Sequence, residues 1–400
     1  MLKRELYLSK IRGFYDSNLV KILVGIRRCG KSVILRQIID ELRDKGICND
    51  HIIYVNFEYI EYEDLQNYKT LNKYIKDKII DKKMYYVFFD EIQNVENFEK
   101  VINSLRASLE NISIFITGSN SKLLSDELST VLSGRYVSFL INPLTYREYV
   151  DLTLKDGKDE NTFWDYVKWG GLPNVTDFED EENIKNYLYS VFDSIILRDV
   201  VDRLGLKDVS LFNLILQYIV DTTGRKFSFK NIMGFLKTER REISSETLYN
   251  YIDALCKALI IKKVYRYDIH GKAILKTLNK YYMTDLGISQ IKNNNFESNK
   301  SFALKNVIYN DLIARGYDVY IGKTKNGEID FIAKRYEEQI YVQVAYKLDG
   351  EKVIEREFGA YKNINDNFPK YVVSLDEEDF SRDGIKHVNM IDWLLTDKID

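Results

Sequence analysis

The sequence predicts an α/β protein that begins with a parallel sheet covered by helices. Three observations lead to this prediction. In residues 1–143, five short apolar runs alternate with segments whose apolar residues recur at helical spacing, which indicates βαβ units. Residues 205–290 show the periodicity of three helices followed by a hairpin, the outline of a winged helix. Residues 301–400 show a helix, three strands, a helix and a strand, which predicts a further α/β domain.

The apolar runs define the elements of the first domain. After an amphipathic helix within residues 1–20, strands are expected at residues 22–24, 51–58, 85–89, 113–116 and 136–141. Helices are expected behind them, with apolar positions within residues 34–42, 65–79, 98–109 and 123–132. Pro143 ends this block and sets the boundary of the first domain, residues 1–143. Ligands of such sheets bind at the carboxyl ends of the strands, so functional residues are expected there.

The first strand runs into Gly25-Ile-Arg-Arg-Cys-Gly-Lys-Ser32, a full match to G-x-x-x-x-G-K-[ST]. A strand before the match and a helix after it are the context of a phosphate-binding P-loop. The glycines let backbone N–H groups close around phosphate oxygens, and the helix N-terminus adds positive potential. Lys31 would contact the β- and γ-phosphates of ATP, and the Ser32 hydroxyl would bind Mg²⁺. The predicted nucleotide-binding residues are Gly25, Arg28, Cys29, Gly30, Lys31, Ser32 and Val33.

Two further strand ends carry candidate catalytic residues. Asp90 and Glu91 follow the third apolar run, as in a Walker B site. Asp90 would hold Mg²⁺ through water and Glu91 would act as general base, and the alternative is a pair of solvated carboxylates. Asn120 follows the fourth strand and would hydrogen-bond the γ-phosphate and the attacking water. Ser119 could take that role, and an ordinary polar turn is the other alternative.

Two arginines could act from outside this loop. Arg135 precedes the fifth strand, where ring-forming ATPases place an arginine finger for the γ-phosphate of a neighbouring subunit. An exposed arginine at a strand start is an equally ordinary interpretation, so a homo-oligomer stays open. Arg198 could reach the nucleotide from the next helical segment, although a structural ion pair explains it better.

The middle of the chain is predicted to form a helical lid at residues 144–204 and a winged helix at residues 205–290. Between Gly205 and Asp285, fourteen Lys and Arg stand against eight Asp and Glu, a local charge of +6 in a chain of net charge −3. This excess is compatible with phosphate contacts to double-stranded DNA. The alternative is a solvated face on a domain that packs internally. The excess clusters at Arg225, Lys226, Lys237, Arg240, Arg241, Lys262, Lys263 and Arg266.

The αβββαβ order of residues 301–400 matches the core of the restriction-endonuclease-like fold. A nuclease of this fold needs Asp on the second strand and E-x-K on the third. Asp330 is present, but Gln343 stands at the Glu position and Ala345 at the Lys position. Strand alternation places Lys347 on the same face, where it could substitute. Because two electrostatic contacts are missing, we expect this domain not to cut DNA.

Composition limits the classes of protein. Apolar content of 45% and charged content of 30% are those of a globular protein, and no apolar run is long enough to span a bilayer. The first five residues are already charged, unlike a signal peptide. Three cysteines and three histidines are too few and too scattered for a disulfide framework or a metal cluster. We therefore expect a cytoplasmic protein with no membrane partner.

The motifs together resemble the bacterial and archaeal AAA-type ATPases with a nuclease-like C-terminal domain of unknown function. The resemblance is carried by Val24–Ser32, Thr117–Asn120, Gly134-Arg135, Gly170–Pro173, Thr284–Gly287 and Gly327–Phe331. It implies ATP binding by the residues named above, a helical lid and a winged helix. Lys305 departs from the pattern, because an acidic residue is expected there.

Three functions follow as hypotheses. The leading one is a Mg²⁺-dependent ATP hydrolase, expected to be slow, that acts as a conformational switch on DNA or a DNA-bound partner. The alternative is an ATP-dependent protein-interaction switch in signalling or defence, without DNA contact. A metal-dependent nuclease is the third and weakest. Stimulation of ATPase activity by DNA separates the first from the second.

Overall fold

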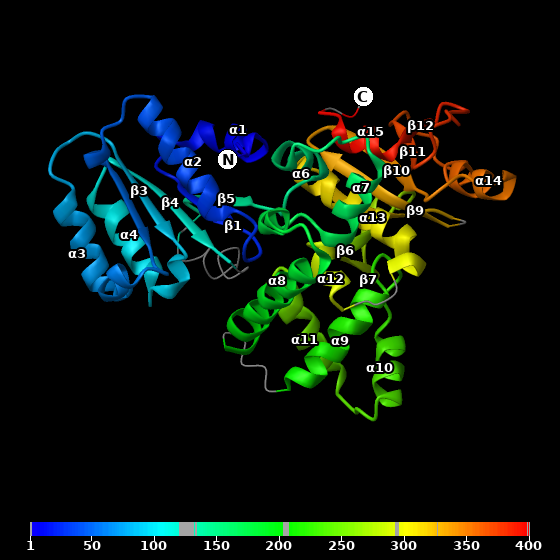
Figure 1. The fold of residues 1–400 in the computed structure, drawn as a ribbon, viewed down its shortest axis with the longest axis horizontal. Helices are drawn as coiled ribbons and strands as arrows, with labels where there is room; N and C mark the ends of the chain where they lie inside the picture. Colours follow the sequence, from blue (N-terminus) through cyan, green and yellow to red (C-terminus); the bar gives the residue numbers. More distant parts are fainter. Residues whose placement is uncertain are drawn as a thin grey trace. The chain divides into compact units, whose positions relative to one another are not determined.

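Two β-sheets organise the chain, each in a unit of its own (Figure 1). The structure, a computed structural model, describes residues 2–119, 132, 134–202, 208–292, 296–325, 327–397 and 399. One unit comprises residues 1–142 with 257–259, and the other comprises residues 143–256 with 260–400. Every helix within these described ranges is too short or too polar to span a bilayer.

The first unit contains a sheet of five parallel strands in the order β2-β3-β4-β1-β5. Strands β1, β3 and β4 are buried along their whole length, which explains why they occur in the sequence as continuous apolar runs. The strands are β1 (Val20–Val24), β2 (Ile52–Asn56), β3 (Tyr85–Asp90), β4 (Ile112–Gly118) and β5 (Tyr136–Leu140). The described helices of this unit are α1 (Glu5–Ile11), α2 (Lys31–Asp44), α3 (Tyr68–Lys78) and α4 (Phe98–Ser108).

This arrangement confirms the predicted parallel sheet and its five strands. The carboxyl ends of β1, β3 and β4 lie at one edge of the sheet, because all neighbouring strands run parallel and these three are adjacent. The P-loop follows β1, and Glu91 and Ser119 follow β3 and β4. The fold therefore brings the predicted motifs to one edge. The helix predicted within residues 123–132 lies outside the described residues.

The second unit is built on a mixed sheet of seven strands in the order β12-β11-β10-β9-β8-β6-β7. Strands β8, β9 and β10 pair antiparallel, whereas β10, β11 and β12 pair parallel. The bounds are β6 (Ile261–Asp268), β7 (Ala273–Met283), β8 (Asp318–Lys323), β9 (Glu328–Arg335), β10 (Glu338–Val344), β11 (Lys370–Ser374) and β12 (Lys386–Asn389).

Helices of the second unit come from three stretches of the chain. The first stretch, predicted as a helical lid, forms α6 (Tyr146–Thr153), α7 (Glu160–Trp169), α8 (Glu181–Ser194) and a π-helical turn at Ile195–Asp202. The second forms α9 (Val209–Asp221), α10 (Phe229–Thr238), α11 (Ser245–Lys257) and α12 (Leu286–Gln290). The third forms α13 (Phe296–Ala314), α14 (Glu351–Gly359) and α15 (Met390–Leu395).

The hairpin predicted for the winged helix is present, but it is not a free wing. β6 and β7 pair antiparallel, and β6 also pairs in parallel with β8. The turn between β6 and β7 is closed by Asp268, whose Oδ1 accepts hydrogen bonds from the N–H groups of His270 at 3.2 Å and Gly271 at 3.0 Å. One hydrogen-bonding edge of the hairpin is therefore already used, and the hairpin continues the C-terminal sheet.

The third C-terminal strand differs from its prediction. Gln343 and Ala345, at the positions of the nuclease motif, are buried, as is Tyr341, and Tyr341 and Ala345 belong to a core cluster under α14. β10 ends at Val344, so Lys347 lies beyond the strand and is exposed. The expectation that Lys347 shares a strand face with Gln343 was therefore wrong, because the pleat does not extend that far.

Two glycine-containing motifs of the sequence meet inside the second unit. The carboxylate of Asp285 accepts from the N–H of Gly171 at 2.8 Å and from the N–H of Gly287 at 2.9 Å. Complete burial raises the pKa of Asp285 to about 6, although these N–H groups oppose the shift. The contact joins the turn after α7 to the start of α12, so these motifs have a structural role within this unit.

Candidate functional site

The P-loop is shaped by a close approach and by a left-handed residue. A side chain on Gly25 would place its Cβ 2.2 Å from the carbonyl oxygen of Ile141. Gly30 has φ of 100° and is the residue before helix α2, so a side chain there would be strained. The buried Cys29 donates from Sγ to the same Ile141 oxygen at 3.3 Å. These contacts explain why small residues stand at the start and the end of the loop.

Lys31, the first residue of α2, is buried with its ammonium facing the loop carbonyls and the third strand. Its Nζ donates to the carbonyl oxygens of Gly25 at 3.1 Å and Ile26 at 3.3 Å. The same nitrogen lies 3.6 Å from Oε1 of Glu91. The P-loop lysine and the predicted general base are therefore neighbours.

Asp90 ends β3 and is fully buried, at 0% exposure. Its Oδ1 accepts from Thr117 Oγ1 at 2.5 Å, and its Oδ2 accepts from Tyr54 OH at 2.7 Å and Asn56 Nδ2 at 3.4 Å. These three donors are neutral and come from the neighbouring strands β2 and β4. They orient the carboxylate without cancelling its charge, which suits an oxygen ligand of a divalent cation.

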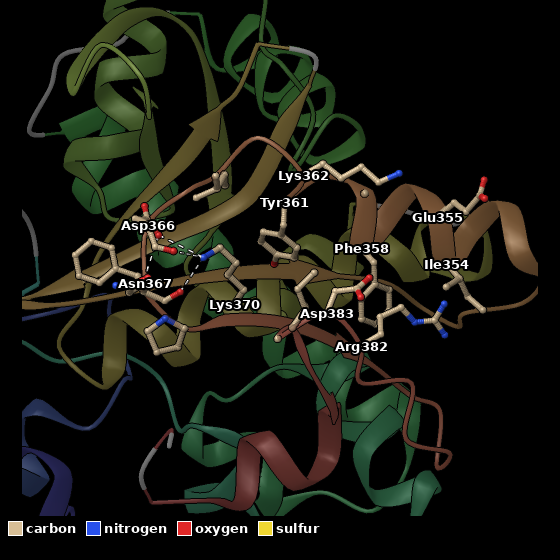
Figure 2. A pocket seen from close by; sticks show the side chains of 16 residues that line it. Ile354, Glu355, Phe358, Tyr361, Lys362, Asp366, Asn367, Lys370, Arg382 and Asp383 are labelled. Carbon is tan, nitrogen blue, oxygen red and sulfur yellow. Dashed lines mark hydrogen bonds and ion pairs between the residues drawn. The ribbon is translucent and has the colours of Figure 1, made fainter.

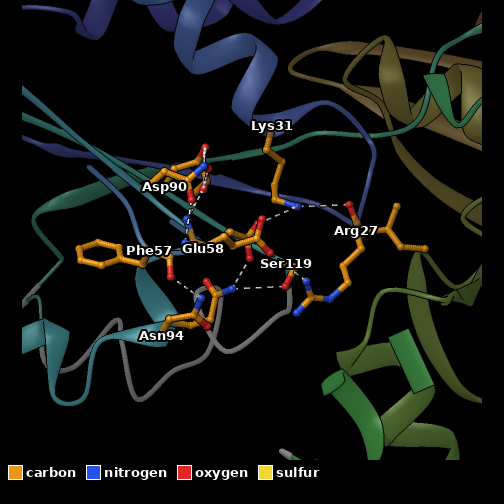
Figure 3. Close-up of polar contacts among 12 residues, drawn as sticks. Arg27, Lys31, Phe57, Glu58, Asp90, Asn94 and Ser119 are labelled. Atoms are coloured by element: carbon orange, nitrogen blue, oxygen red, sulfur yellow. Dashed lines mark hydrogen bonds and ion pairs between the residues drawn. The ribbon is translucent and has the colours of Figure 1, made fainter. Parts of the chain in front are cut away.

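Glu91 has a left-handed backbone, with φ of 56°, which is uncommon for a residue with a side chain. Its N–H donates to Thr117 Oγ1 at 2.9 Å, and its carboxylate accepts from Gln93 Nε2. Burial alone would raise the pKa of Glu91, but Lys31, Gln93 and Arg27 outweigh it and hold the pKa below its usual range. The carboxylate is therefore ionised at neutral pH. Figure 3 shows the polar contacts of this site, with Lys31, Asp90 and Ser119 labelled.

Of the remaining predicted residues, Ser119 lies in this site and Arg135 lies far from it. Ser119 is buried, and its Oγ accepts from Gln93 Nε2 at 3.4 Å, whereas Asn120 and the side chain of Arg198 lie outside the described residues. Arg135 is exposed and precedes β5, so it lies at the amino ends of the strands. The P-loop lies at the opposite ends, about 16 Å away over five residues of strand. Arg135 is therefore too far from its own P-loop to contact a phosphate bound there.

Sequence reasoning missed the residues that orient the two carboxylates. Tyr54 and Asn56 come from β2, Thr117 from β4 and Gln93 from the turn after β3. A polar residue at the carboxyl end of an otherwise apolar strand was the available signal for Asn56 and Thr117. Tyr54 and Gln93 carried no such signal, since tyrosine is common throughout this chain.

The residues at this edge of the sheet fit Mg²⁺ and ATP. Gly25 and Gly30 allow the loop to adopt its backbone conformation, Lys31 starts the helix behind the loop, and Asp90 presents a carboxylate oriented by neutral donors. Gln93 Oε1 is buried without a hydrogen-bond partner among the described residues, so a polar group can be accommodated beside Glu91. These features fit a bound nucleotide with a divalent cation.

A second pair of carboxylates lies at the start of β9, in the other unit. Asp330 Oδ1 is 2.6 Å from Lys305 Nζ, and its Oδ2 accepts from the N–H of Val344 at 3.0 Å. Glu328 is surrounded by three cations: Arg266 Nε at 3.2 Å, Lys226 Nζ at 3.4 Å and Lys280 Nζ at 3.6 Å. Both carboxylates are thus neutralised by side chains of the chain itself.

This cluster corrects one predicted DNA contact. Arg266 was grouped with the basic residues available for phosphate, but it is buried against Glu328. Lys226 also pairs with Glu328, although its side chain is 50% exposed. The charge excess of residues 205–285 is therefore partly used within the protein.

A cavity of about 560 Å³ lies elsewhere in the second unit, between α14 and the chain around β11 (Figure 2). Two of its cations are engaged by neighbours: Lys370 Nζ donates to the Asp366 carbonyl at 2.8 Å, and the Arg382 guanidinium lies 5.0 Å from the Phe358 ring centre. The described residues that line this cavity include none of the predicted motif residues. It is a weaker candidate than the P-loop edge.

Comparisons with known proteins agree with the site in the first unit. Residues 17–150 match the family model described as an AAA domain, and residues 160–298 match a domain of unknown function, DUF8612. An uncharacterized protein of Haemophilus influenzae is 36% identical over 400 residues, covering 99% of both chains. An uncharacterized protein of Methanocaldococcus jannaschii is 31% identical over 386 residues, covering 91% of this chain and 84% of that one.

Among solved structures, the Walker-type ATPase of Pyrococcus abyssi aligns with a TM-score of 0.52 at 17% identity, over 73% of this chain and 96% of that one. This likeness concerns the fold alone. AAA-domain proteins generally bind ATP and Mg²⁺. The predicted AAA-type domain is thereby confirmed, whereas the nuclease-like character of the C-terminal strands stays a prediction. The chain belongs to the family of AAA-domain proteins that includes these bacterial and archaeal relatives.

Proposed function

We propose that the protein binds ATP with Mg²⁺ in its first unit and hydrolyses it slowly, as a conformational switch. The observation that carries the proposal is the meeting of Lys31, Asp90 and Glu91 at the carboxyl ends of β1 and β3. A P-loop lysine beside a buried aspartate and an ionised glutamate is the set of groups that phosphoryl transfer to water requires.

Each residue would have a defined task. Lys31 and the backbone N–H groups of the P-loop bind the phosphates, and Ser32 and Asp90 hold Mg²⁺, Asp90 through water. Bound Mg²⁺ would supply charge neutralisation on the phosphate oxygens. Glu91 accepts the proton of the attacking water, and its lowered pKa supports this task because it keeps the carboxylate ionised.

The partner of the switch is proposed to bind the second unit. Double-stranded DNA is one candidate, supported by exposed cations such as Lys237 and Arg240 at the end of α10. A protein partner is the second candidate. The burial of Arg266 against Glu328 and the pairing of β6 with β8 favour it, because both reduce the surface that a wing would offer to DNA.

The proposal is tested by measuring phosphate release from ATP with Mg²⁺, with and without double-stranded DNA, at two salt concentrations. Stimulation by DNA that weakens as salt rises supports a DNA-directed switch, because phosphate contacts release counterions. Hydrolysis that DNA leaves unchanged supports the protein-directed switch. Phosphate release no faster than that of Glu91→Gln protein would contradict ATP hydrolysis at this site.

Arg135 is proposed to act on the nucleotide bound by a second copy of the chain, because it lies at the amino ends of the strands and its own P-loop lies at their carboxyl ends. Arg135→Ala protein should bind ATP normally and hydrolyse it poorly. Mixing it with Lys31→Ala protein should restore activity at shared interfaces. A mixture no more active than its parts would contradict this role.

The C-terminal strands are proposed to keep a nuclease-like arrangement without cleavage activity. The order α13-β8-β9-β10-α14-β11 supports the arrangement, and Lys305 on Asp330 opposes binding of a divalent cation there. Purified protein should leave supercoiled plasmid intact with Mg²⁺ or Mn²⁺. Nicking that disappears in Asp330→Ala protein would contradict this proposal.

A further inference from the structure

The N-terminal segment of the chain contacts a backbone carbonyl of the P-loop. Arg4, the residue before α1, is 3% exposed. Its Nη1 donates to the carbonyl oxygen of Cys29 at 3.1 Å, and its Nη2 donates to the carbonyl oxygen of Asn142 at 3.1 Å. One guanidinium group therefore joins the P-loop to the segment that follows β5.

Arg4 is itself held on several sides. Its backbone N–H donates to Gln37 Oε1 at 3.0 Å, and Gln37 Nε2 donates to the Leu2 carbonyl at 2.6 Å. The guanidinium lies 4.8 Å from the ring centre of Tyr7, whose hydroxyl accepts from the Asn142 N–H at 3.0 Å. Since Gln37 lies on α2, the helix that begins at the P-loop, the arginine is fixed relative to that loop.

The contact with Cys29 has a chemical consequence for phosphate binding. The Cys29 carbonyl and the Gly30 N–H belong to the same peptide group. A charged donor on the carbonyl oxygen polarises that peptide, which makes its N–H a stronger donor. Backbone N–H groups of a P-loop are the groups that surround the α- and β-phosphates. Arg4 therefore acts on the side of the loop opposite to the phosphates.

We propose that Arg4 is a positioning residue for nucleotide binding, which holds the Cys29–Gly30 peptide in the orientation that receives the phosphates. The proposal rests on the proposed function of the first unit. This role differs from attaching α1 to the rest of the unit, because other residues make contacts that attach α1. Arg12, for example, links Glu5 of α1 to Glu41 of α2, with Nε 2.9 Å from Glu41 Oε2.

The experiment compares Arg4→Lys with Arg12→Ala, each in the full chain. Lysine keeps the charge, but a single ammonium on a flexible stem cannot reproduce the fork that bridges two carbonyls. We measure the affinity for ATP and for ADP by calorimetry, and the melting temperature without nucleotide. Arg4→Lys should bind both nucleotides about ten-fold more weakly, as expected for loss of a charge-assisted hydrogen bond. Arg12→Ala should lower the melting temperature, because it removes the partly buried ion pair with Glu41. It should leave both affinities within about two-fold of wild type, because Arg12 pairs with Glu5 and Glu41, which lie outside the P-loop.

The outcomes separate the claims. If wild-type protein binds ATP and Arg4→Lys binds it equally well, Arg4 is only structural and this inference fails while the proposed function stands. An equal loss of affinity in both variants would likewise assign the effect to anchoring of α1. A loss for ATP without a loss for ADP would place the effect at the γ-phosphate and overturn the inference. Wild-type protein that binds neither nucleotide would overturn the proposed function itself.

Discussion

Each unit has a pair of carboxylates at one end of a strand, Asp90 and Glu91 at the end of β3 and Glu328 and Asp330 at the start of β9. The side chains around the two pairs differ in charge. In the first unit, the three direct donors to Asp90 are the neutral groups of Thr117, Tyr54 and Asn56. In the second unit, Asp330 is paired with Lys305, and Glu328 is surrounded by three cations. Asp90 therefore keeps its negative charge for an external cation, although Glu91 beside it lies 3.6 Å from Lys31. In the second pair, both carboxylates are already neutralised.

The difference shows that a carboxylate motif indicates a metal site only when the charges of the neighbouring side chains are known. Asp330 was identified in the sequence as the remaining residue of a nuclease metal site, whereas Asp90 and Glu91 were identified as a Walker B site. What separates the two is the charge of side chains contributed by distant segments, such as Lys305 from α13. Buried ion pairs of this kind add specificity to a fold and bring little net stability, but breaking one of them is costly.

The largest expected effect is on turnover at the first pair. Glu91→Gln should keep ATP affinity within a few-fold and lower kcat by about a hundred-fold or more, because the charge on the metal ligands is untouched while the base is lost. Phosphate release and ATP calorimetry measure the two quantities. Glu96→Gln, at an exposed position five residues on, is the matched control and should behave as wild type. Normal turnover in Glu91→Gln would place the base elsewhere.

The next effect is on stability at the second pair. Asp330→Asn should destabilise the second unit by about 3–5 kcal/mol, because it leaves Lys305 largely buried beside a neutral amide. Adding Lys305→Met should recover part of this loss, since no charge then remains unpaired. Urea unfolding measures both variants, and ATP affinity should stay unchanged in both. A stable Asp330→Asn protein would mean that the ion pair does not contribute to this unit.

The smallest effect sharpens the comparison at a buried cation of the first unit. Lys21 donates to Ser17 O at 2.9 Å and Ser113 Oγ at 2.7 Å, and burial lowers its pKa to about 7. An unfolded lysine has a pKa of about 10.4, so between these values the unfolded chain binds more protons and stability rises with pH. From pH 7 to 9, the unfolding free energy of wild type should therefore rise relative to that of Lys21→Met, by at most about 1.4 kcal/mol per pH unit. A difference that is constant over this range would show that Lys21 stays charged.

Much of the first unit could be predicted because its information is local. Strands such as β3 are buried on both faces and therefore occur as unbroken apolar runs, and the P-loop is a contiguous motif. The predicted positions of Lys31, Asp90 and Glu91 followed from strand order alone, since parallel strands end at the same edge.

The contacts that were missed depend on distant pairing. The β6–β8 pairing joins residues 55 positions apart, such as Arg266 and Ile321, and hairpin periodicity carries no information about such a partner. In the sequence, Arg4 was only one of the charges in the first five residues, because its acceptors Cys29 O and Asn142 O are backbone atoms that no side-chain pattern reveals. Lys347 failed for a different reason: the strand ends three residues before it.

The central claim, that the P-loop of the first unit binds ATP through Lys31, is tested most directly by calorimetric titration with Mg-ATP. Wild-type protein should bind one equivalent, and Lys31→Ala should show no binding at the same concentrations, because this ammonium, at the start of α2, is the group expected to meet the β- and γ-phosphates. Lys45→Ala, at the other end of α2, removes the same charge from an exposed position and should bind as wild type. Unchanged ATP affinity in Lys31→Ala protein would contradict the account.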